Sequence, residues 1–244
     1  MGRTYAVTED VTLLGGLLPD VVRWAESAVP DVAAQERAAA DGRAETIEAG
    51  LFPEEREHIA QAVAKRRAEF AAVRRCARRA LHDLGFPPVP ILPGEQREPL
   101  WPAGVVGSMT HCAGYCAAAV AHAGEVSALG IDAEVHAPLP EGVLDLVSLE
   151  AEREHLTGLA GQNGEVHWDR VLFSAKESVY KAWFPLTHRW LGFEQAEIVL
   201  RTDGGFEATV LLGADHPAGS PHGFAGRWAV QGGLIATAIG GVVG

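Results

Sequence analysis

The strongest helical pattern in the chain runs from about residue 53 to residue 84, where apolar side chains recur every three or four positions. They form one stripe: Ile59, Val63, Phe70, Val73, Ala77, Leu81 and Leu84. Pro53 is typical of a first helical turn, and Gly85 followed by Pro87 is typical of a helix end. We therefore expect one long helix over residues 53–84.

This helix carries an island of positive charge. Between Lys65 and Arg79 there are seven basic residues and one acidic one, a local charge of +6 in a chain whose net charge is −12. Lys65, Arg75 and Arg79 project away from the apolar stripe, whereas Arg66 falls within it and Arg74 beside it. A buried unpaired charge is costly. Either Arg66 pairs with an internal acid or extends to solvent along its stem, or Arg66 and Arg74 border a cleft that holds an anion such as a small polyphosphate.

Alternating patterns mark the middle of the chain. Residues 105–124 form two short apolar runs around a small-residue turn at 112–114, which predicts a pair of strands. In the stretch Gly-Ile-Asp-Ala-Glu at 130–134, apolar and polar residues then alternate, so Asp132 and Glu134 face the same side of a strand. Carboxylates are the hard oxygen ligands that suit Mg²⁺, but Asp-x-Glu triplets are common on exposed strands and do not by themselves indicate a metal site.

Two further helices are expected in the second half, one over residues 142–160 and one that ends at Pro185. On the latter helix, Glu177 and Lys181 share a face with Ser174, almost opposite the apolar side. Lys176 lies beside the apolar side, where a structural role and a ligand-binding role are equally open. The apolar side comprises Leu172, Ala175, Val179, Ala182 and Trp183.

These patterns predict an α+β protein with two loosely similar halves. Each half offers a helix with charged candidate residues and then strands, and a boundary near residue 125 would separate residues 1–125 from residues 126–244. The tail reads as antiparallel strands joined by Gly-rich turns. Residues 29–45 read as either a short helix or a loop.

Composition narrows the functional classes. The net charge of −12 argues against nucleic-acid binding across the whole surface. No apolar run approaches the roughly 20 residues of a membrane helix, and residues 1–14 carry acids where a signal peptide would be basic and then apolar. We therefore expect a soluble cytoplasmic protein without a membrane partner. The three cysteines are expected to be reduced and packed as small apolar residues.

Several motifs together resemble one enzyme family. The segments Gly-Ser-Met-Thr-His-Cys-Ala-Gly-Tyr at 107–115, Gly-Ile-Asp-Ala-Glu at 130–134 and Phe-Ser-Ala-Lys-Glu-Ser-Val-Tyr-Lys-Ala-Trp at 173–183 resemble the 4′-phosphopantetheinyl transferases. The segments at 97–102 and 181–193 strengthen the likeness, which is to the large single-chain, surfactin-synthetase type and its actinobacterial members. It extends from about Leu51 to about Phe193.

The resemblance implies an activity and a fold. Such enzymes move the phosphopantetheine arm of coenzyme A (CoA) onto a serine of an apo acyl or peptidyl carrier domain and release adenosine 3′,5′-bisphosphate. The carriers belong to fatty-acid, polyketide or nonribosomal peptide synthases. The family fold is a pseudo-dimer of two similar halves, each a small antiparallel sheet packed on a long helix, with the active site between them. A monomer with an internal pseudo-twofold axis is therefore expected.

The resemblance also implies roles for individual residues. Asp132, Glu134 and Glu177 would bind Mg²⁺, with Mn²⁺ as an alternative, and Glu177 is the candidate general base. Lys181 would contact the pyrophosphate of CoA, and Lys176 would assist unless its role is structural. Further candidates for contacts with CoA are Arg66, Arg74, Thr110, His111 and Leu191. The chain departs from close relatives at Pro93, where they often carry a lysine, so one basic phosphate contact is expected to be missing.

Other functions use the same residues. A metal-dependent phosphohydrolase acting on CoA or a nucleotide would employ the same acids with water as the acceptor. A non-catalytic module that binds CoA or carriers is the second alternative, and the intact set of three acids argues against it. A thiol enzyme built on Cys112 and His111 is disfavoured, because adjacent residues on a strand point in opposite directions.

Overall fold

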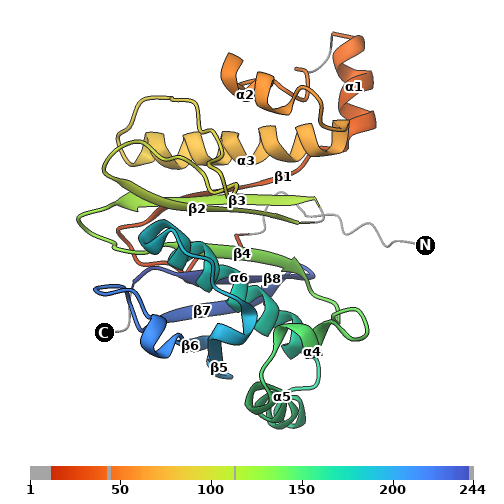
Figure 1. The fold of residues 1–244 in the computed structure, drawn as a ribbon. Coiled ribbons are helices and arrows are strands. Elements are labelled where there is room, and N and C mark those ends of the chain that lie inside the picture. The colour runs from red at the N-terminus through yellow and green to blue at the C-terminus, as the bar shows by residue number, and fades with distance from the viewer. Residues whose placement is uncertain (1–11, 43–44, 113, 242–244) are drawn as a thin grey trace.

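The computed structural model describes residues 12–42, 45–112 and 114–241, and shows two antiparallel sheets layered with helices (Figure 1). Residues 1–11, most of the stretch considered for a signal peptide, and residue 113 of the predicted turn lie outside the described residues. The α+β class predicted from the sequence is confirmed. No helix among the described residues is both long enough and apolar enough to cross a membrane.

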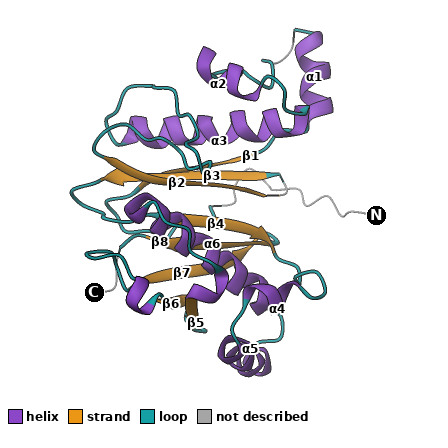
Figure 2. Ribbon diagram, in the orientation of Figure 1, coloured by secondary structure: helices purple, strands orange, loops and turns teal. Residues whose placement is uncertain are grey.

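The first sheet has the order β1-β3-β2 and is covered on one face by α3 (Figure 2). Its strands are β1 (Arg23–Ala28), β2 (Val105–Cys112) and β3 (Tyr115–His122). Three helices belong to this half: α1 (Val32–Ala40), α2 (Pro53–Ile59) and α3 (Ala64–Asp83). Ala77 and Leu81 of α3 pack against Ala118 and Val120 of β3, so small side chains let the helix lie close to the sheet.

The prediction of one helix over residues 53–84 is wrong, because the chain breaks between α2 and α3. Val63 is extended at the start of α3, with ψ of 152°, and its side chain is 73% exposed rather than buried in the stripe. The break has a packing reason. Ile59 at the end of α2 folds back to pack with Leu51 and Phe70, which a continuous helix would prevent.

The second sheet has the order β4-β8-β7-β6-β5 and packs on α6. Its strands are β4 (Gly130–Val135), β5 (Ala196–Leu200), β6 (Gly205–Val210), β7 (Gly223–Gln231) and β8 (Leu234–Ile239), and its helices are α4 (Val143–Val147), α5 (Glu150–Gln162) and α6 (Trp168–Thr187). Short 3₁₀ turns lie at Phe193–Gln195 and Gly213–Asp215. The expected antiparallel tail and the expected apolar side of α6 are both confirmed.

Two helix predictions in this half need correction. The single helix expected over 142–160 is divided into α4 and α5 by Ser148, which is extended with ψ of 152°. Pro185 does not end α6; the helix continues to Thr187, and His188 closes it in a left-handed conformation. A proline two residues from a helix end removes only one backbone hydrogen bond, so the last turn survives.

The N-terminal region has only a weak pattern. Residues 32–40 form α1, so the helix is the correct alternative for the stretch that was predicted as either a helix or a loop. The strand β1 was not predicted. Only Ala25 of β1 is buried, so the strand has no alternating pattern to detect.

The two sheets meet where β2 lies beside β4, and side-chain hydroxyls join them. Ser108 Oγ accepts a hydrogen bond from the Ile131 backbone N–H, and Thr110 Oγ1 accepts one from Ala133, each at 3.0 Å. At Gly130 a Cβ atom would lie 2.1 Å from the Ser178 carbonyl oxygen, so only glycine lets α6 approach β4 this closely. The acids of β4 are thereby placed at the junction of both sheets and α6.

Candidate active site

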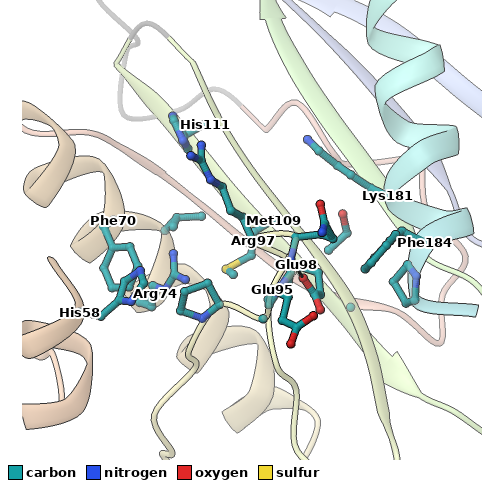
Figure 3. Close-up of a pocket in the computed structure, with 18 of the residues that line it drawn as sticks. His58, Phe70, Arg74, Glu95, Arg97, Glu98, Met109, His111, Lys181 and Phe184 are labelled. Carbon is teal, nitrogen blue, oxygen red and sulfur yellow. Dashed lines mark hydrogen bonds between the residues drawn. The ribbon is translucent and has the colours of Figure 1, made fainter. Parts of the chain in front are cut away.

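A pocket of about 710 Å³ opens between α3 and α6 (Figure 3). The N-terminal end of α3, the loop 93–99 and β2 line one part, and α6 lines the other. Basic or imidazole side chains enter it from both parts: Arg66, Arg74, Arg97, His111 and Lys181. Such a concentration of N–H donors on facing walls suits a ligand with several phosphate groups.

Arg66 and His111 form a pair at this pocket. Arg66 is exposed, and its Nη1 donates to His111 Nε2 at 2.9 Å. Because arginine has no acceptor, the imidazole nitrogen must accept, which leaves the ring proton on Nδ1, 3.9 Å from the Glu69 carboxylate. Burial lowers the pKa of His111, and Glu69 opposes that shift. Arg66 therefore borders the pocket instead of lying inside the core.

Arg74 is the buried cation of α3. Its guanidinium carbon lies 3.5 Å from the centroid of the Phe70 ring, and its Nε donates to the Ile91 carbonyl at 3.2 Å. Within the described part of the chain, its two terminal nitrogens have no hydrogen-bond acceptor. Burial lowers the pKa of Arg74 to about 9, partly offset by Glu55, so the group is still charged at neutral pH. An anion in the pocket would supply the missing acceptors.

Other cations of the basic island hold the chain ahead of α2. Arg67 forms an ion pair with Glu48 at 3.2 Å, and Arg75 and Arg78 donate hydrogen bonds to the carbonyls of Ala49 and Gly50 at 3.4 and 2.7 Å. The local charge of +6 therefore overstates the positive charge at the anion site, because these three arginines bind the segment to α3 instead.

Asp132 is the most constrained acid of the site. Lys181 Nζ donates to its Oδ1 at 2.7 Å, and Thr110 Oγ1 donates to the same oxygen at 3.3 Å. Ser174 Oγ donates to Oδ2 at 2.8 Å. With the residue only 5% exposed, these three donors leave its carboxylate little freedom to turn.

Glu177, in contrast to Asp132, is not held by hydrogen bonds from the described residues. It lines the pocket from α6 and has no hydrogen bond or ion pair with any residue that the structure describes. Burial raises its pKa, and the negative charge of Asp132 raises it further, while Lys181 lowers it. Its carboxylate is therefore available to a ligand or substrate.

Glu134 is paired with a residue that the sequence analysis missed. Arg170 Nη1 donates to its Oε2 at 3.1 Å, and the same guanidinium binds the carbonyls of Ala137 and Pro138. Burial raises the pKa of Glu134 to about 6, and the neighbouring Asp132 adds to the shift. Arg170 lies four positions before Ser174, on the helix face that Ser174 shares with Glu177 and Lys181, and this spacing was the signal available for it.

The acids suit a divalent cation only together with a ligand. Among the described residues, no three His, Cys, Asp or Glu side chains converge closely enough to hold a metal ion by themselves. Mg²⁺ typically takes one or two carboxylates and completes its shell with waters and substrate phosphates. Asp132, Glu134 and Glu177 provide oxygen donors. Burial, and then the negative charge of Asp132, raises the pKa of both Glu134 and Glu177, and a divalent cation would relieve both effects, so the three acids fit such an ion.

Five candidate residues do not line the pocket: Asp132, Glu134, Thr110, Lys176 and Leu191. Asp132 lies behind Lys181, which bonds to it and does line the pocket. Lys176 of α6 is buried and points towards α5 and β5. Its ammonium contacts the Glu152 carboxylate at 2.8 Å and donates to the Ala196 carbonyl at 2.9 Å. Leu191 packs into the core of the second half. Thr110 is buried at the junction of β2 and β4. The contacts of Lys176 with Glu152 and Ala196 support a structural role for this lysine.

Sequence comparison bears on the identity of this site. Residues 54–121 match the 4′-phosphopantetheinyl transferase N-terminal domain, and residues 128–231 match the 4′-phosphopantetheinyl transferase superfamily. The chain is 57% identical to the 4′-phosphopantetheinyl transferase Svp of Streptomyces mobaraensis, over 78% of each chain. It is 53% identical to PptT of Mycobacterium tuberculosis over 77% of this chain and 85% of the relative, and 51% identical to Npt of Nocardia iowensis over 77% and 87%. This chain belongs to the 4′-phosphopantetheinyl transferase family.

Proposed function

We propose that this chain transfers the phosphopantetheine arm of CoA to a serine of apo acyl or peptidyl carrier domains and releases adenosine 3′,5′-bisphosphate. The family acts in this way on carrier proteins. One observation carries the proposal for this chain. A single pocket brings the cations of α3 opposite Glu177 and Lys181 of α6.

CoA suits both chemical parts of the pocket. Arg66, Arg74 and His111 would bind its phosphates, and their importance is greater because Pro93 lines the pocket where close relatives often carry a lysine. Apolar side chains of the lining, among them Phe70, Met109, Tyr180 and Phe184, offer a surface for the pantetheine arm.

The acids would serve the transfer itself. Asp132, Glu134 and Glu177 are the proposed ligands of Mg²⁺, with Mn²⁺ as an alternative. When bound, the ion neutralises charge that develops on the pyrophosphate. The serine oxygen forms a bond to the phosphorus that carries the pantetheine arm, and the bond from that phosphorus to the bridging oxygen breaks.

Two side chains of α6 would complete the reaction. Glu177 would accept the serine proton, directly or through water, because it reaches the pocket without another partner among the described residues. Lys181 lies between Asp132 and the pocket and would stabilise charge on the leaving phosphate.

The proposed enzyme is a monomer. Both walls of the pocket come from one chain, which supports a monomer whose halves, residues 1–125 and 126–244, together build the site. We place it in the cytoplasm, consistent with three free cysteines. Burial, with Glu134 and Asp132, raises the pKa of Cys112 to about 12, which argues against the thiol-enzyme alternative.

The deciding experiment is intact-mass analysis of apo carrier proteins incubated with the chain, CoA and Mg²⁺. A mass gain equal to the phosphopantetheine arm, abolished by a chelator, is the expected result. CoA consumption without any carrier gain, across fatty-acid, polyketide and peptide carriers, would favour the phosphohydrolase. CoA binding without turnover would favour the non-catalytic module.

A further inference from the structure

A buried chain of hydroxyl groups lies beneath the Asp132 carboxylate. Ser174 and Ser178 come from consecutive turns of α6, and Thr237 comes from β8; all three are fully buried. Ser178 Oγ lies 2.6 Å from Thr237 Oγ1, which lies 3.0 Å from Ser174 Oγ, which in turn lies 2.8 Å from Asp132 Oδ2. Hydroxyls at the core of a helix–sheet interface have no packing advantage over alanine, so their arrangement calls for another explanation.

The acid at the end of this chain fixes the direction of the bond that reaches it. An ionised carboxylate only accepts, so Ser174 must donate its single proton to Asp132. Thr237 then donates to the Ser174 hydroxyl or to the Ser174 carbonyl at 2.9 Å, and Ser178 donates to the Thr237 hydroxyl or to the Thr237 carbonyl at 3.2 Å. The bond from Ser174 to Asp132 therefore has a fixed direction, whichever acceptors the other two hydroxyls use.

The bond from Ser174 to Asp132 matters because of the carboxylate oxygen that it reaches. Lys181 and Thr110 both donate to Oδ1, so Ser174 is the one donor to Oδ2 among the described residues. The terminal torsion of an aspartate is broad and is not held by rotamer preference. Without Ser174, the carboxylate is held at one oxygen only and can turn about its Cβ–Cγ bond.

We propose that Ser174 is a positioning residue, which sets the rotation of the Asp132 carboxylate and so presents it to the divalent cation. This inference rests on the proposed function, in which Asp132 is a metal ligand. Residues that orient metal ligands in this way typically change metal affinity or activity by about 10–100-fold when they are removed.

The test compares Ser174→Ala with Ser178→Ala. Both substitutions delete a fully buried hydroxyl of α6 that contacts Thr237, but only the first removes a contact with Asp132. Mn²⁺ binding is titrated in the presence of CoA by electron paramagnetic resonance, without carrier protein. We expect the Mn²⁺ dissociation constant to rise about 10-fold in Ser174→Ala and to stay at the parent value in Ser178→Ala. Thermal unfolding of both variants monitors the fold.

Equal Mn²⁺ affinity in the two variants would overturn the proposal, since it would reduce Ser174 to a packing residue. Should Ser174→Ala not fold, Ser174→Cys keeps nearly the same volume with a weaker donor; a raised dissociation constant is again expected, and an unchanged one overturns the proposal. In carrier assays, the Mg²⁺ concentration for half-maximal transfer should rise in Ser174→Ala while the KM for CoA stays constant. A parent enzyme that binds Mn²⁺ but modifies no carrier would contradict the proposed function alone, because the Mn²⁺ comparison still decides the role of Ser174.

Discussion

The two halves of the molecule anchor their long helices with the same device but expose different chemistry from them. In the first half the device is centred on Glu55 in the first turn of α2, which is fully buried. Its carboxylate accepts hydrogen bonds from the backbone N–H groups of Phe52 and Ile91, each at 2.9 Å. It also accepts one from Arg78 of α3 at 2.8 Å. One acid thus joins a short helix, a long helix and the chain beyond it.

The second half repeats this arrangement around Glu152 in the first turn of α5. The carboxylate accepts hydrogen bonds from the backbone N–H groups of Leu149 and Ile198, each at 2.7 Å. Its cationic partner is Lys176 of α6, at 2.8 Å, and both side chains are 1% exposed. Lys176 is therefore the counterpart of Arg78, which is why it faces away from the pocket.

The two halves therefore share one framework and divide the residues of the site between them. α3 supplies Arg66 and Arg74 to the pocket, and α6 supplies Glu177 and Lys181. The two helices thus offer an anion-binding wall and a catalytic wall. Substitutions in the shared device should lower stability, and substitutions on the pocket walls should lower activity.

The largest effect is expected from breaking the shared device. Lys176→Met leaves Glu152 buried without its cation and should lower the free energy of unfolding by about 3–5 kcal/mol. Arg78→Met should act in the same direction through Glu55. Urea unfolding measures the loss, and Lys65→Met, at an 84% exposed side chain, is the control. A stable Lys176→Met with a raised KM for CoA would instead make Lys176 a ligand contact and end the comparison with Arg78.

Next in size is the loss of the free acid on the catalytic wall. Glu177→Ala should lower carrier modification by more than about 100-fold, beyond the usual effect of residues that only orient metal ligands. Its melting temperature should equal or exceed that of the parent, because the repulsion between Glu177 and Asp132 is relieved. Mass analysis of the carrier and a thermal melt test both points. Glu95→Ala, which removes an acid from the loop side of the same pocket, is the matched control. Activity within a few-fold of the parent would remove Glu177 from the reaction.

A smaller effect is expected on the anion-binding wall. Arg74→Ala should raise the KM for CoA about 10-fold, because charge-assisted hydrogen bonds to phosphate are lost, and should leave kcat close to that of the parent. Arg66→Ala should act similarly but less, since it is more exposed. Arg79→Ala, on the exposed side of the same helix, should leave the KM unchanged. Steady-state kinetics with varied CoA decides, and an unchanged KM in both pocket variants would refute the division into two walls.

The sequence predicted this division in part. The alternation around Asp132 and the helical spacing of Glu177 and Lys181 are local patterns. In the structure Ile131 and Ala133 pack in an apolar core while Asp132 bonds to Ser174 of α6, and Glu177 and Lys181 line the pocket together. The alternation did not predict that Asp132 is itself buried.

Periodicity predicted the angular positions of Arg66 and Arg74 on α3, but it did not predict how deeply each side chain is buried. Arg66, in the first turn, opens onto the pocket, whereas Arg74 lies two turns further on and is buried.

Long-range packing accounts for what the sequence did not reveal. The break after α2 depends on the contact of Ile59 with Phe70. The shared device depends on pairs such as Glu55 with Arg78, 23 residues apart on different helices. No local pattern encodes such a pair. The residues themselves looked like ordinary members of an acidic first turn and of a basic island.

The smallest effect concerns Thr110, at the point where the two halves join. Its hydroxyl accepts from Ala133 and donates to Asp132, and Thr110 is 4% exposed, so it has little access to the phosphates of CoA. Thr110→Val keeps the shape but leaves a backbone N–H unpaired, which should lower the free energy of unfolding by about 1 kcal/mol. The KM for CoA should stay constant, as it should in Ser178→Ala, which removes a hydroxyl away from the junction. A raised KM with unchanged stability would show instead that this hydroxyl binds the substrate and that β2 belongs to the anion-binding wall.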